Sequence, residues 1–104
     1  MRIEWSEVAF EDLLNIQRYL TQNAPYYADH FIDKLMSATD KLEDFPEMGR
    51  LVPEADEDDG EMRELFYQRF RLMYQVNTEE DLVLIVCVVC YFPNSSRINQ
   101  PFFP

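Results

Sequence analysis

The first half of the chain has the hydrophobic spacing of two amphipathic helices. The first helix is expected over about residues 7–22, after Ser6, whose hydroxyl can cap its N-terminus. The second is expected over about residues 25–44, with Pro25 in its first turn and Pro46 just beyond its end. A short loop joins them, so they form an antiparallel helical hairpin. The apolar positions expected to face the core are Ala9, Phe10, Leu13, Leu14, Ile16 and Leu20 in the first helix and Ala28, Phe31, Ile32, Leu35, Met36, Thr39, Leu42 and Phe45 in the second.

Beyond residue 60 the hydrophobic period changes from that of a helix to that of a strand. In "FRLMYQV", residues 70–76, every second position is aromatic or aliphatic, which predicts a strand with one buried face. The preceding "EMRELFY", residues 61–67, is expected to pair with it through a turn near Gln68 and Arg69. "LVLIVCVVCY", residues 82–91, is apolar on both faces and rich in β-branched residues, as is typical of a strand well inside a sheet. The short alternating "RIEW", residues 2–5, adds a strand before the first helix.

These elements predict one α+β domain over residues 1–104, in the order β-α-α-β-β-β. The helical hairpin is expected to pack on one face of a mainly antiparallel sheet and to leave the other face less covered. "PEMGRLVPEADEDDGE", residues 46–61, is loop by composition. The tail, residues 93–104, has no hydrophobic period, and it is expected either to pack Phe102 and Phe103 on a neighbour or to be mobile.

The charge of the chain limits its partners. Nine basic and 20 acidic residues give a formal charge of −11. This charge argues against broad adhesion to nucleic acid, because phosphate binding needs a positive footprint. Many of the acids lie in the segment 54–61, which is expected to be a solvated loop, with repulsion of wrong partners as its functional alternative. Asp56, Asp58 and Gly60 do not keep the register of an EF-hand calcium loop.

The sequence predicts neither a membrane segment nor an export signal. No apolar run approaches the roughly 20 residues that span a bilayer, and the N-terminus lacks the zones of a signal peptide. We therefore expect a cytoplasmic protein without a membrane partner. Two cysteines, Cys87 and Cys90, are too few for a disulfide framework and fit a reducing compartment.

Two candidate reactive motifs have simpler structural explanations. "CVVC" lies in a predicted strand, where residues three apart point to opposite faces, so Cys87 and Cys90 are expected to diverge and to serve packing rather than redox or zinc chemistry. His30 is expected at the surface of the second helix, without a serine or cysteine beside it to make a catalytic arrangement. We therefore expect no metal and no cofactor.

The arginines near the predicted hairpin are the strongest candidates for a binding site. Arg71 is out of phase with the buried positions of its strand, so it is expected to leave the sheet on the face away from the helices. Arg63 and Arg69 flank it on the same hairpin, and Arg50 can approach from the preceding loop. Clustered guanidinium groups suit phosphate or carboxylate recognition, but pairing with the many nearby acids explains them equally well.

The order of these motifs resembles the RelE/ParE toxin superfamily of bacterial type II toxin–antitoxin systems, in particular its ParE-like branch. The resemblance covers about residues 3–92 and rests on "EWSEVAFEDLLNIQRYL", "ADHFIDKLMSATDKLEDFPEMGRLVPE" and "RELFYQRFRLMYQV" with the apolar strand after it. It implies a compact β-α-α-β-β-β toxin that is held inactive by an antitoxin whose extended segment wraps around it. ParE-like members characteristically poison DNA gyrase and act in plasmid stabilisation, whereas RelE-like members cleave mRNA on the ribosome.

The resemblance also implies roles for individual residues. Arg71 matches the strand arginine common to both branches, Arg50 matches the arginine after the second helix, and Arg63 matches the first residue of the "RELF" strand. Together with Arg69 they are the residues expected to bind the target or the antitoxin. The substitution Arg71→Ala is expected to weaken toxicity without unfolding the protein, because its side chain lies off the core.

The chain departs from the nuclease branch of the superfamily. Cys90 stands where those members often have a histidine, and Phe70 stands at a common polar aromatic position. Arg71 and Tyr91 then form a thin catalytic set for phosphodiester cleavage. We therefore expect a non-enzymatic toxin that inhibits gyrase. The alternatives are a ribosome-dependent mRNA endoribonuclease and an attenuated toxin that only binds its antitoxin.

The net charge is a further departure, because the family is commonly basic and its antitoxins acidic. A charge of −11 predicts an antitoxin segment that is more basic or more apolar than usual.

Overall fold

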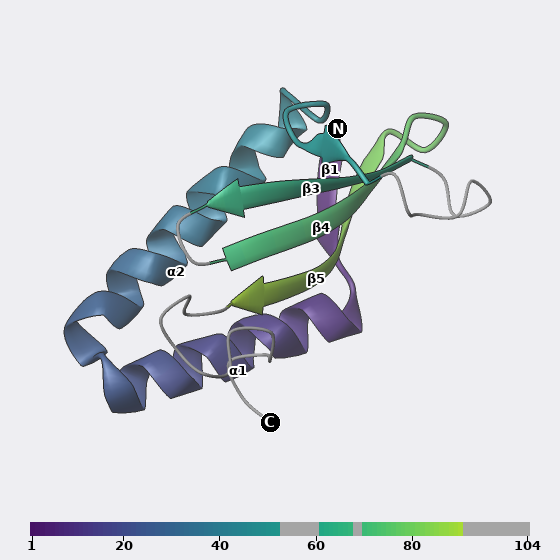
Figure 1. Ribbon diagram of the computed structural model, residues 1–104. Coiled ribbons are helices and arrows are strands. Elements are labelled where there is room, and N and C mark those ends of the chain that lie inside the picture. The colour runs from purple at the N-terminus through teal and green to yellow at the C-terminus, as the bar shows by residue number, and fades with distance from the viewer. Residues whose placement is uncertain (53–60, 68–69, 91–104) are drawn as a thin grey trace.

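The computed structural model describes residues 1–52, 61–67 and 70–90, with the backbone alone at Tyr67 and Cys90 (Figure 1). Residues 53–60, 68–69 and 91–104, on which the expected acidic loop, hairpin turn and tail fall, lie outside the described residues. The elements in chain order are β1 (Arg2–Trp5), α1 (Glu7–Asn23), α2 (Pro25–Asp40), a 3₁₀ turn η1 (Lys41–Glu43), β2 (Arg50–Leu51), β3 (Glu61–Tyr67), β4 (Phe70–Asn77) and β5 (Leu82–Cys90).

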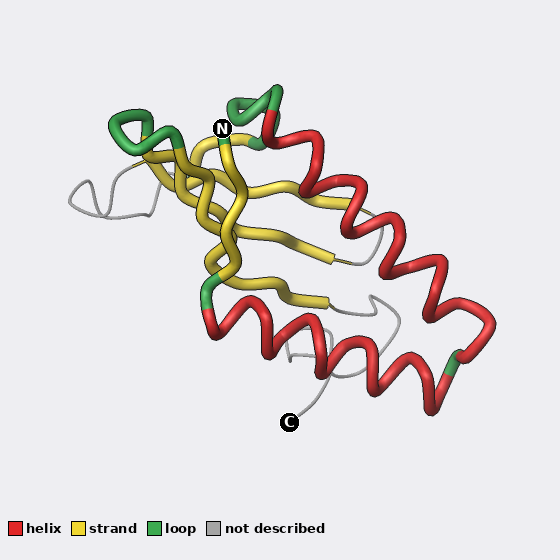
Figure 2. The backbone as a smooth tube through the Cα atoms, turned by 180° about the vertical axis from the view of Figure 1, so that it is seen from behind, coloured by secondary structure: helices red, strands yellow, loops and turns green. Residues whose placement is uncertain are grey.

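The strands form one five-stranded sheet in the order β1-β5-β4-β3-β2. Strand β1 runs parallel to β5, and all other neighbours are antiparallel. The two helices pack on the same face of this sheet, as the view from behind shows (Figure 2). The predicted α+β fold, with a helical hairpin on a mainly antiparallel sheet, is confirmed. No helix of the described residues lies over the other sheet face, called the outer face below.

The helices begin where the sequence predicts. The hydroxyl of Ser6 accepts a hydrogen bond from the backbone N–H of Ala9 at 3.0 Å, which satisfies one free donor of the first turn of α1. Pro25 lies in the first turn of α2, where a backbone N–H has no hydrogen-bond partner within the helix, so the lack of this group in proline costs nothing. Helix α2 ends earlier than expected, at Asp40, because the chain tightens there into η1.

The core lies between the helical hairpin and the inner face of the sheet. Its helical part is narrower than predicted, since Phe10, Leu14, Met36 and Phe45 are exposed. Each residue turns an α-helix by about 100°, so the neighbours of a central stripe rotate out of the contact with the sheet. The buried apolar residues are Ala9, Ile16, Leu20, Ala28, Phe31, Leu35, Leu42, Phe70, Leu72, Tyr74, Val76, Val83, Ile85 and Val88.

Helix α1 is tied to β5 where the parallel partner strand ends. The register of β4 and β5 passes from Met73–Cys87 to Tyr74–Ile85, so β5 carries one extra residue, Val86. The hydroxyl of Ser6 donates to the carbonyl of Val86 at 2.9 Å. Two residues further along β5, the Asp12 carboxylate accepts a hydrogen bond from the N–H of Val88 at 3.0 Å. Side chains of α1 thus satisfy backbone groups of β5 beyond the end of β1.

Strand β2 is an element that the sequence did not predict. The segment "PEMGRLVPE" was expected to be loop, but Arg50 and Leu51 pair with Glu64 and Arg63 of β3. Two residues are too short to show a period, so no pattern could reveal this strand. Its effect is to fix Arg50 against the edge of the sheet. In the described part of the chain, no helix has the length and apolar character needed to cross a membrane.

Candidate functional site

Arg71 emerges from the outer face of the sheet, as the sequence predicts. Along β4 the residues Phe70, Leu72 and Tyr74 are buried beneath the helices, and the residues between them are only partly buried. Arg71 lies opposite Phe66 in the register of β3 and β4, so both side chains stand on the outer face. The strand period therefore separates this cation from the core.

On the outer face, two arginines converge on one carboxylate. Arg50 Nε donates to Glu64 Oε1 at 2.5 Å, and Arg71 Nε donates to Glu64 Oε2 at 2.6 Å. Arg71 adds a second contact to the same oxygen through Nη2. The three side chains come from three adjacent strands, β2, β3 and β4. Together with Phe66 they are called the outer-face cluster below.

The Glu64 carboxylate is buried although neither α1 nor α2 covers it. Its side chain is 0% exposed, while those of Arg50 and Arg71 are 68% and 36% exposed. Burial alone would raise the pKa of Glu64. The hydrogen bonds from Arg50 and Arg71 outweigh burial, and they hold the pKa of this carboxyl below its ordinary value. Glu64 is therefore ionised at neutral pH and shared by the two guanidinium groups.

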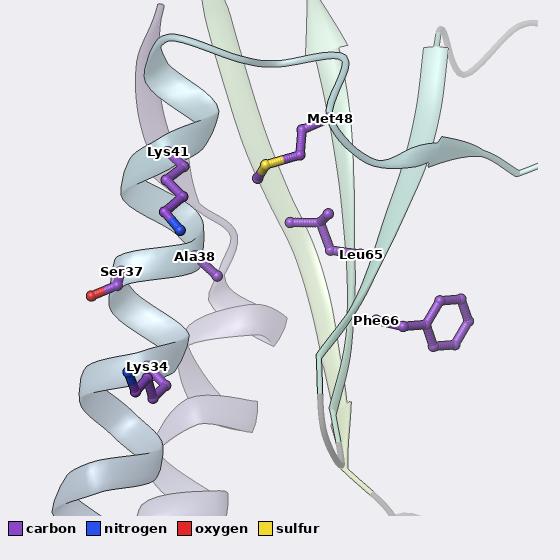
Figure 3. Close-up of a pocket in the computed structure, with 7 residues that line it drawn as sticks. All are labelled: Lys34, Ser37, Ala38, Lys41, Met48, Leu65 and Phe66. Atoms are coloured by element: carbon purple, nitrogen blue, oxygen red, sulfur yellow. The ribbon is translucent and has the colours of Figure 1, made fainter.

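Phe66 is the aromatic member of the cluster. The guanidinium carbons of Arg50 and Arg71 lie 5.8 Å and 5.7 Å from the centre of its ring, within the range of cation–π attraction. The ring is 54% exposed. Figure 3 shows Phe66 pointing from β3 to the side away from α2. The outer face thus presents an exposed aromatic ring with an arginine beside it on each of two neighbouring strands.

Arg63 does not join this cluster. It lies opposite Tyr74 in the register, which places it on the inner face, and its side chain is only 13% exposed. Its Nη1 donates to the carbonyl of Gly49 at 2.6 Å and to that of Glu47 at 3.2 Å. Hydrogen bonds to Glu61 are the main reason that the pKa of Arg63 is raised above its ordinary value. The expected grouping of Arg63 with Arg71 is therefore wrong, and Arg63 holds a loop.

Tyr74 also holds this loop, through hydrogen bonds of its hydroxyl group. Its hydroxyl donates to the carbonyl of Pro46 at 2.8 Å and accepts from the N–H of Gly49 at 2.9 Å. Burial is the main cause that raises the pKa of Tyr74 above its ordinary value. Gly49 packs so closely that a Cβ there would lie 2.6 Å from the Glu64 carbonyl oxygen and 2.7 Å from the Tyr74 hydroxyl. Gly49, Arg63 and Tyr74 are called the loop clamp below, and they position Arg50.

A groove lies on the other side of β3, against helix α2. It encloses about 230 Å³, and Figure 3 shows Leu65 and Met48 pointing toward the helix across it. Both lysines of the chain are among its lining residues. Strand β2 pairs only with Arg63 and Glu64, so the part of β3 at Leu65 and Phe66 is an unpaired sheet edge within the described residues. The lining residues are Lys34, Ser37, Ala38, Lys41, Met48, Leu65 and Phe66.

The remaining predicted residues either lie outside the described residues or stand apart from the cluster. Arg69 and Tyr91 lie outside the described residues. Cys87 is half-buried, and burial is the main cause that raises the pKa of its thiol, as expected of a packing residue. His30 is exposed on α2, as predicted. Among the described side chains, no three acidic, histidine or cysteine residues gather as metal ligands would.

Three comparisons relate the chain to known proteins. Residues 3–90 match the family model of the ParE toxin of type II toxin–antitoxin systems, parDE. A solved structure described as a chromosomal ParDE TA system from P. aeruginosa aligns with a TM-score of 0.67 and 19% identity, over 85% of this chain and 92% of that chain. At this identity the alignment indicates a common fold. No curated protein matches the chain.

Proposed function

The chain belongs to the ParE toxin family of type II toxin–antitoxin systems, and we propose that it acts by inhibiting DNA gyrase and is neutralised by a cognate antitoxin. Gyrase as the target comes from the characteristic activity of the ParE-like branch. The role in plasmid stabilisation and the cytoplasmic location belong to the same proposal. The outer-face cluster is the surface proposed to meet the target.

One observation carries the choice of a binding function over a nuclease. The cluster offers two oriented arginines, but its single carboxylate is engaged by both of them. Because the pKa of Glu64 is lowered, this group is a poor proton donor at neutral pH, and its lone pairs are taken by the arginines. Phosphodiester cleavage requires proton transfer to the leaving oxygen as well as charge stabilisation. The cluster supports recognition more readily than it supports that chemistry.

The direct test adds the purified full-length chain to DNA gyrase and relaxed plasmid. We expect inhibition of supercoiling with accumulation of cleaved plasmid, and no inhibition when the antitoxin is added first. The matching cellular experiment expresses the chain in growing bacteria and follows plasmid supercoiling and mRNA integrity. Unchanged supercoiling with rapid cutting of ribosome-bound mRNA would replace gyrase by the nuclease alternative. Normal growth with antitoxin binding intact would leave an attenuated toxin.

The groove between α2 and β3 is the surface proposed to bind the antitoxin. Ala38, Met48 and Leu65 give it an apolar lining, and the unpaired edge at Leu65 offers backbone hydrogen bonds to an extended segment. An apolar antitoxin segment fits this lining, in agreement with the expectation drawn from the charge of the chain.

The groove is tested with the cognate antitoxin. Met48→Arg places a bulky charge in the groove, so we expect the antitoxin affinity measured by calorimetry to fall about tenfold or more. Leu14→Arg, an equally polar change at an exposed position of α1, is the matched control and should leave the affinity unchanged. Equal affinities for both variants would remove the groove from the antitoxin interface.

A further inference from the structure

The proposed function assigns the outer-face cluster to the target but does not explain what Glu64 and Phe66 contribute to it. We propose that Arg50, Glu64, Phe66 and Arg71 together form a receptor for one carboxylate group of the protein target, presented next to an apolar side chain. The inference rests on the proposed function, because it names the chemistry by which that target is recognised.

The contacts with Glu64 use only some of the N–H donors of the two arginines, whose side chains are both partly exposed. Glu64 accepts from Arg50 through Nε and from Arg71 through Nε and Nη2. A guanidinium group carries five N–H donors, so both arginines have further donors to offer. Among the described residues, no other acceptor hydrogen-bonds to these two groups. A second carboxylate can therefore be bound by both arginines without displacing Glu64.

The charge of the cluster suits a single anion. Two guanidinium groups and one carboxylate leave a net charge of +1, whereas the whole chain carries −11. A phosphate backbone would bring many negative charges against the rest of this acidic protein, and its binding requires an extended positive surface. One carboxylate needs only the local +1. The charges thus favour an acidic side chain of a protein over a nucleic acid.

Glu64 acts as a positioning residue for the two arginines. It is fixed within strand β3 and fully buried, so the guanidinium groups that bind it are held in place before a ligand arrives. Holding long side chains in advance lowers the entropy lost on binding. The loop clamp fixes the backbone beside Arg50, which also holds this side chain in advance.

Phe66 determines what accompanies the carboxylate. Its exposed ring stands beside both cations, and Val89, exposed as well, lies opposite Arg71 in the register of β4 and β5. An apolar side chain of the target can cover this ring and exclude water from the ion pair, which strengthens it. The expected recognition unit is an acidic residue adjacent to an apolar one.

The receptor is tested by titrating the ¹⁵N-labelled full-length chain with acetylated, amidated peptides. A Glu-Leu dipeptide should shift the Nε–H signals of Arg50 and Arg71 and the ring signals of Phe66 saturably, and a Gln-Leu dipeptide should not. Arg50→Gln should weaken this binding about tenfold, because it removes a charge-assisted donor. Phe66→Leu should weaken it about threefold. Well-dispersed amide spectra establish that each variant is folded.

Arg2→Gln is the matched control. Arg2 is also an exposed arginine that binds a glutamate, Glu4, at 3.2 Å, but it has neither a second arginine nor an aromatic ring in its ion pair. This variant should bind the Glu-Leu peptide like the wild type. Equal shifts with the Gln-Leu peptide, or unchanged binding by Arg50→Gln, would overturn the receptor. Tighter binding of a short oligonucleotide at the same signals would also overturn it, in favour of phosphate.

The titration contains no gyrase, so it fails independently of the proposed function. Loss of peptide binding with gyrase inhibition intact would remove only the receptor. Peptide binding without gyrase inhibition would leave the receptor and remove only gyrase as its target.

Discussion

Arg63 and Arg71 leave opposite faces of one hairpin, and the regions they build differ in what binds the cation. Arg63 is directed to the inner face, where backbone carbonyls of Glu47 and Gly49 and the Glu61 carboxylate surround it. Arg71 is directed to the outer face, where it shares the buried Glu64 with Arg50. In the loop clamp the guanidinium of Arg63 is enclosed by acceptors of its own chain. In the outer-face cluster the guanidinium of Arg71 stays partly exposed and keeps further N–H donors.

This difference shows why a cluster of arginines in a sequence is not yet a binding surface. Both residues are arginines on adjacent strands, and both make short hydrogen bonds. What separates them is exposure, 13% for Arg63 against 36% for Arg71, and the number of cations that share one acceptor. A guanidinium that is enclosed by its own chain stabilises the fold, and one that is held at the surface can recognise a partner.

The largest effect on stability is expected from breaking the outer-face cluster. Arg71→Met leaves the buried Glu64 carboxylate with one partner instead of two, so the free energy of unfolding should fall by about 3 kcal/mol. Arg71→Ala was expected to leave the protein folded because its side chain lies off the core, but a position off the core does not protect against this cost. Urea denaturation measures it. A loss below about 0.5 kcal/mol, the level of an ordinary surface change, would show that Glu64 does not depend on Arg71.

A somewhat smaller loss is expected from overfilling the loop clamp. In Gly49→Ala the new Cβ would meet the Glu64 carbonyl and the Tyr74 hydroxyl, so the loop must move and the free energy of unfolding should fall by about 2 kcal/mol. The double variant Gly49→Ala/Tyr74→Phe should lose less than the sum of the two single changes, because it relieves one of the two contacts. Strict additivity would contradict the packing described for Gly49.

Removing one hydroxyl from the loop clamp should cost less again. Tyr74→Phe leaves the N–H of Gly49 and the carbonyl of Pro46 without their partner, for a loss of about 1.5 kcal/mol in the free energy of unfolding. The aromatic packing of Tyr74 in the core stays intact, so thermal denaturation should remain cooperative. An unchanged melting temperature would mean that the loop is held by other contacts.

Acid should weaken the outer-face cluster through Glu64. The folded pKa of Glu64 lies below its ordinary value of 4.5, so its contribution is present above that pH and is lost as the pH falls through the folded pKa. The unfolding free energy of the wild type minus that of Glu64→Gln should therefore shrink as the pH falls from 6 toward the acid limit of folding. A difference that is constant with pH would show that Glu64 is not held ionised by its two arginines.

The smallest effect is expected at an exposed ion pair of the same residue types. Arg2 binds Glu4, and both side chains are more than half exposed. Arg2→Gln should change the free energy of unfolding by no more than about 0.5 kcal/mol, because water screens such pairs. A loss as large as that of Arg71→Met would mean that burial of the carboxylate is not what distinguishes the outer-face cluster.

The sequence predicted the helices, the main strands and the outward position of Arg71, because each depends on a local period that several residues repeat. It did not predict β2, since two residues show no period. The ion pair of Arg50 with the buried Glu64 could not be predicted either, because Arg50 reaches this carboxylate from β2. Local patterns cannot show contacts that depend on which strand lies beside which.

The side of the sheet on which Arg63 lies could have been predicted from the sequence. The turn expected near Gln68 and Arg69 implies that Tyr67 lies opposite Phe70, and counting back along both strands from that pair brings Arg63 opposite Tyr74, as in the observed register. Residues in register share a face, so Arg63 had to lie on the side of the core. The error came from grouping arginines by their proximity in the sequence instead of by the face that the register gives them.

The central claim is that the outer-face cluster, and not the loop clamp, meets the target. The most direct measurement is the concentration that halves gyrase supercoiling, compared between Arg71→Lys and Arg63→Lys as folded full-length chains. Lysine keeps the charge but loses the fork of donors, so both changes test geometry. We predict a rise of about tenfold for Arg71→Lys and less than about twofold for Arg63→Lys. Equal rises, or a larger one for Arg63→Lys, would contradict the claim.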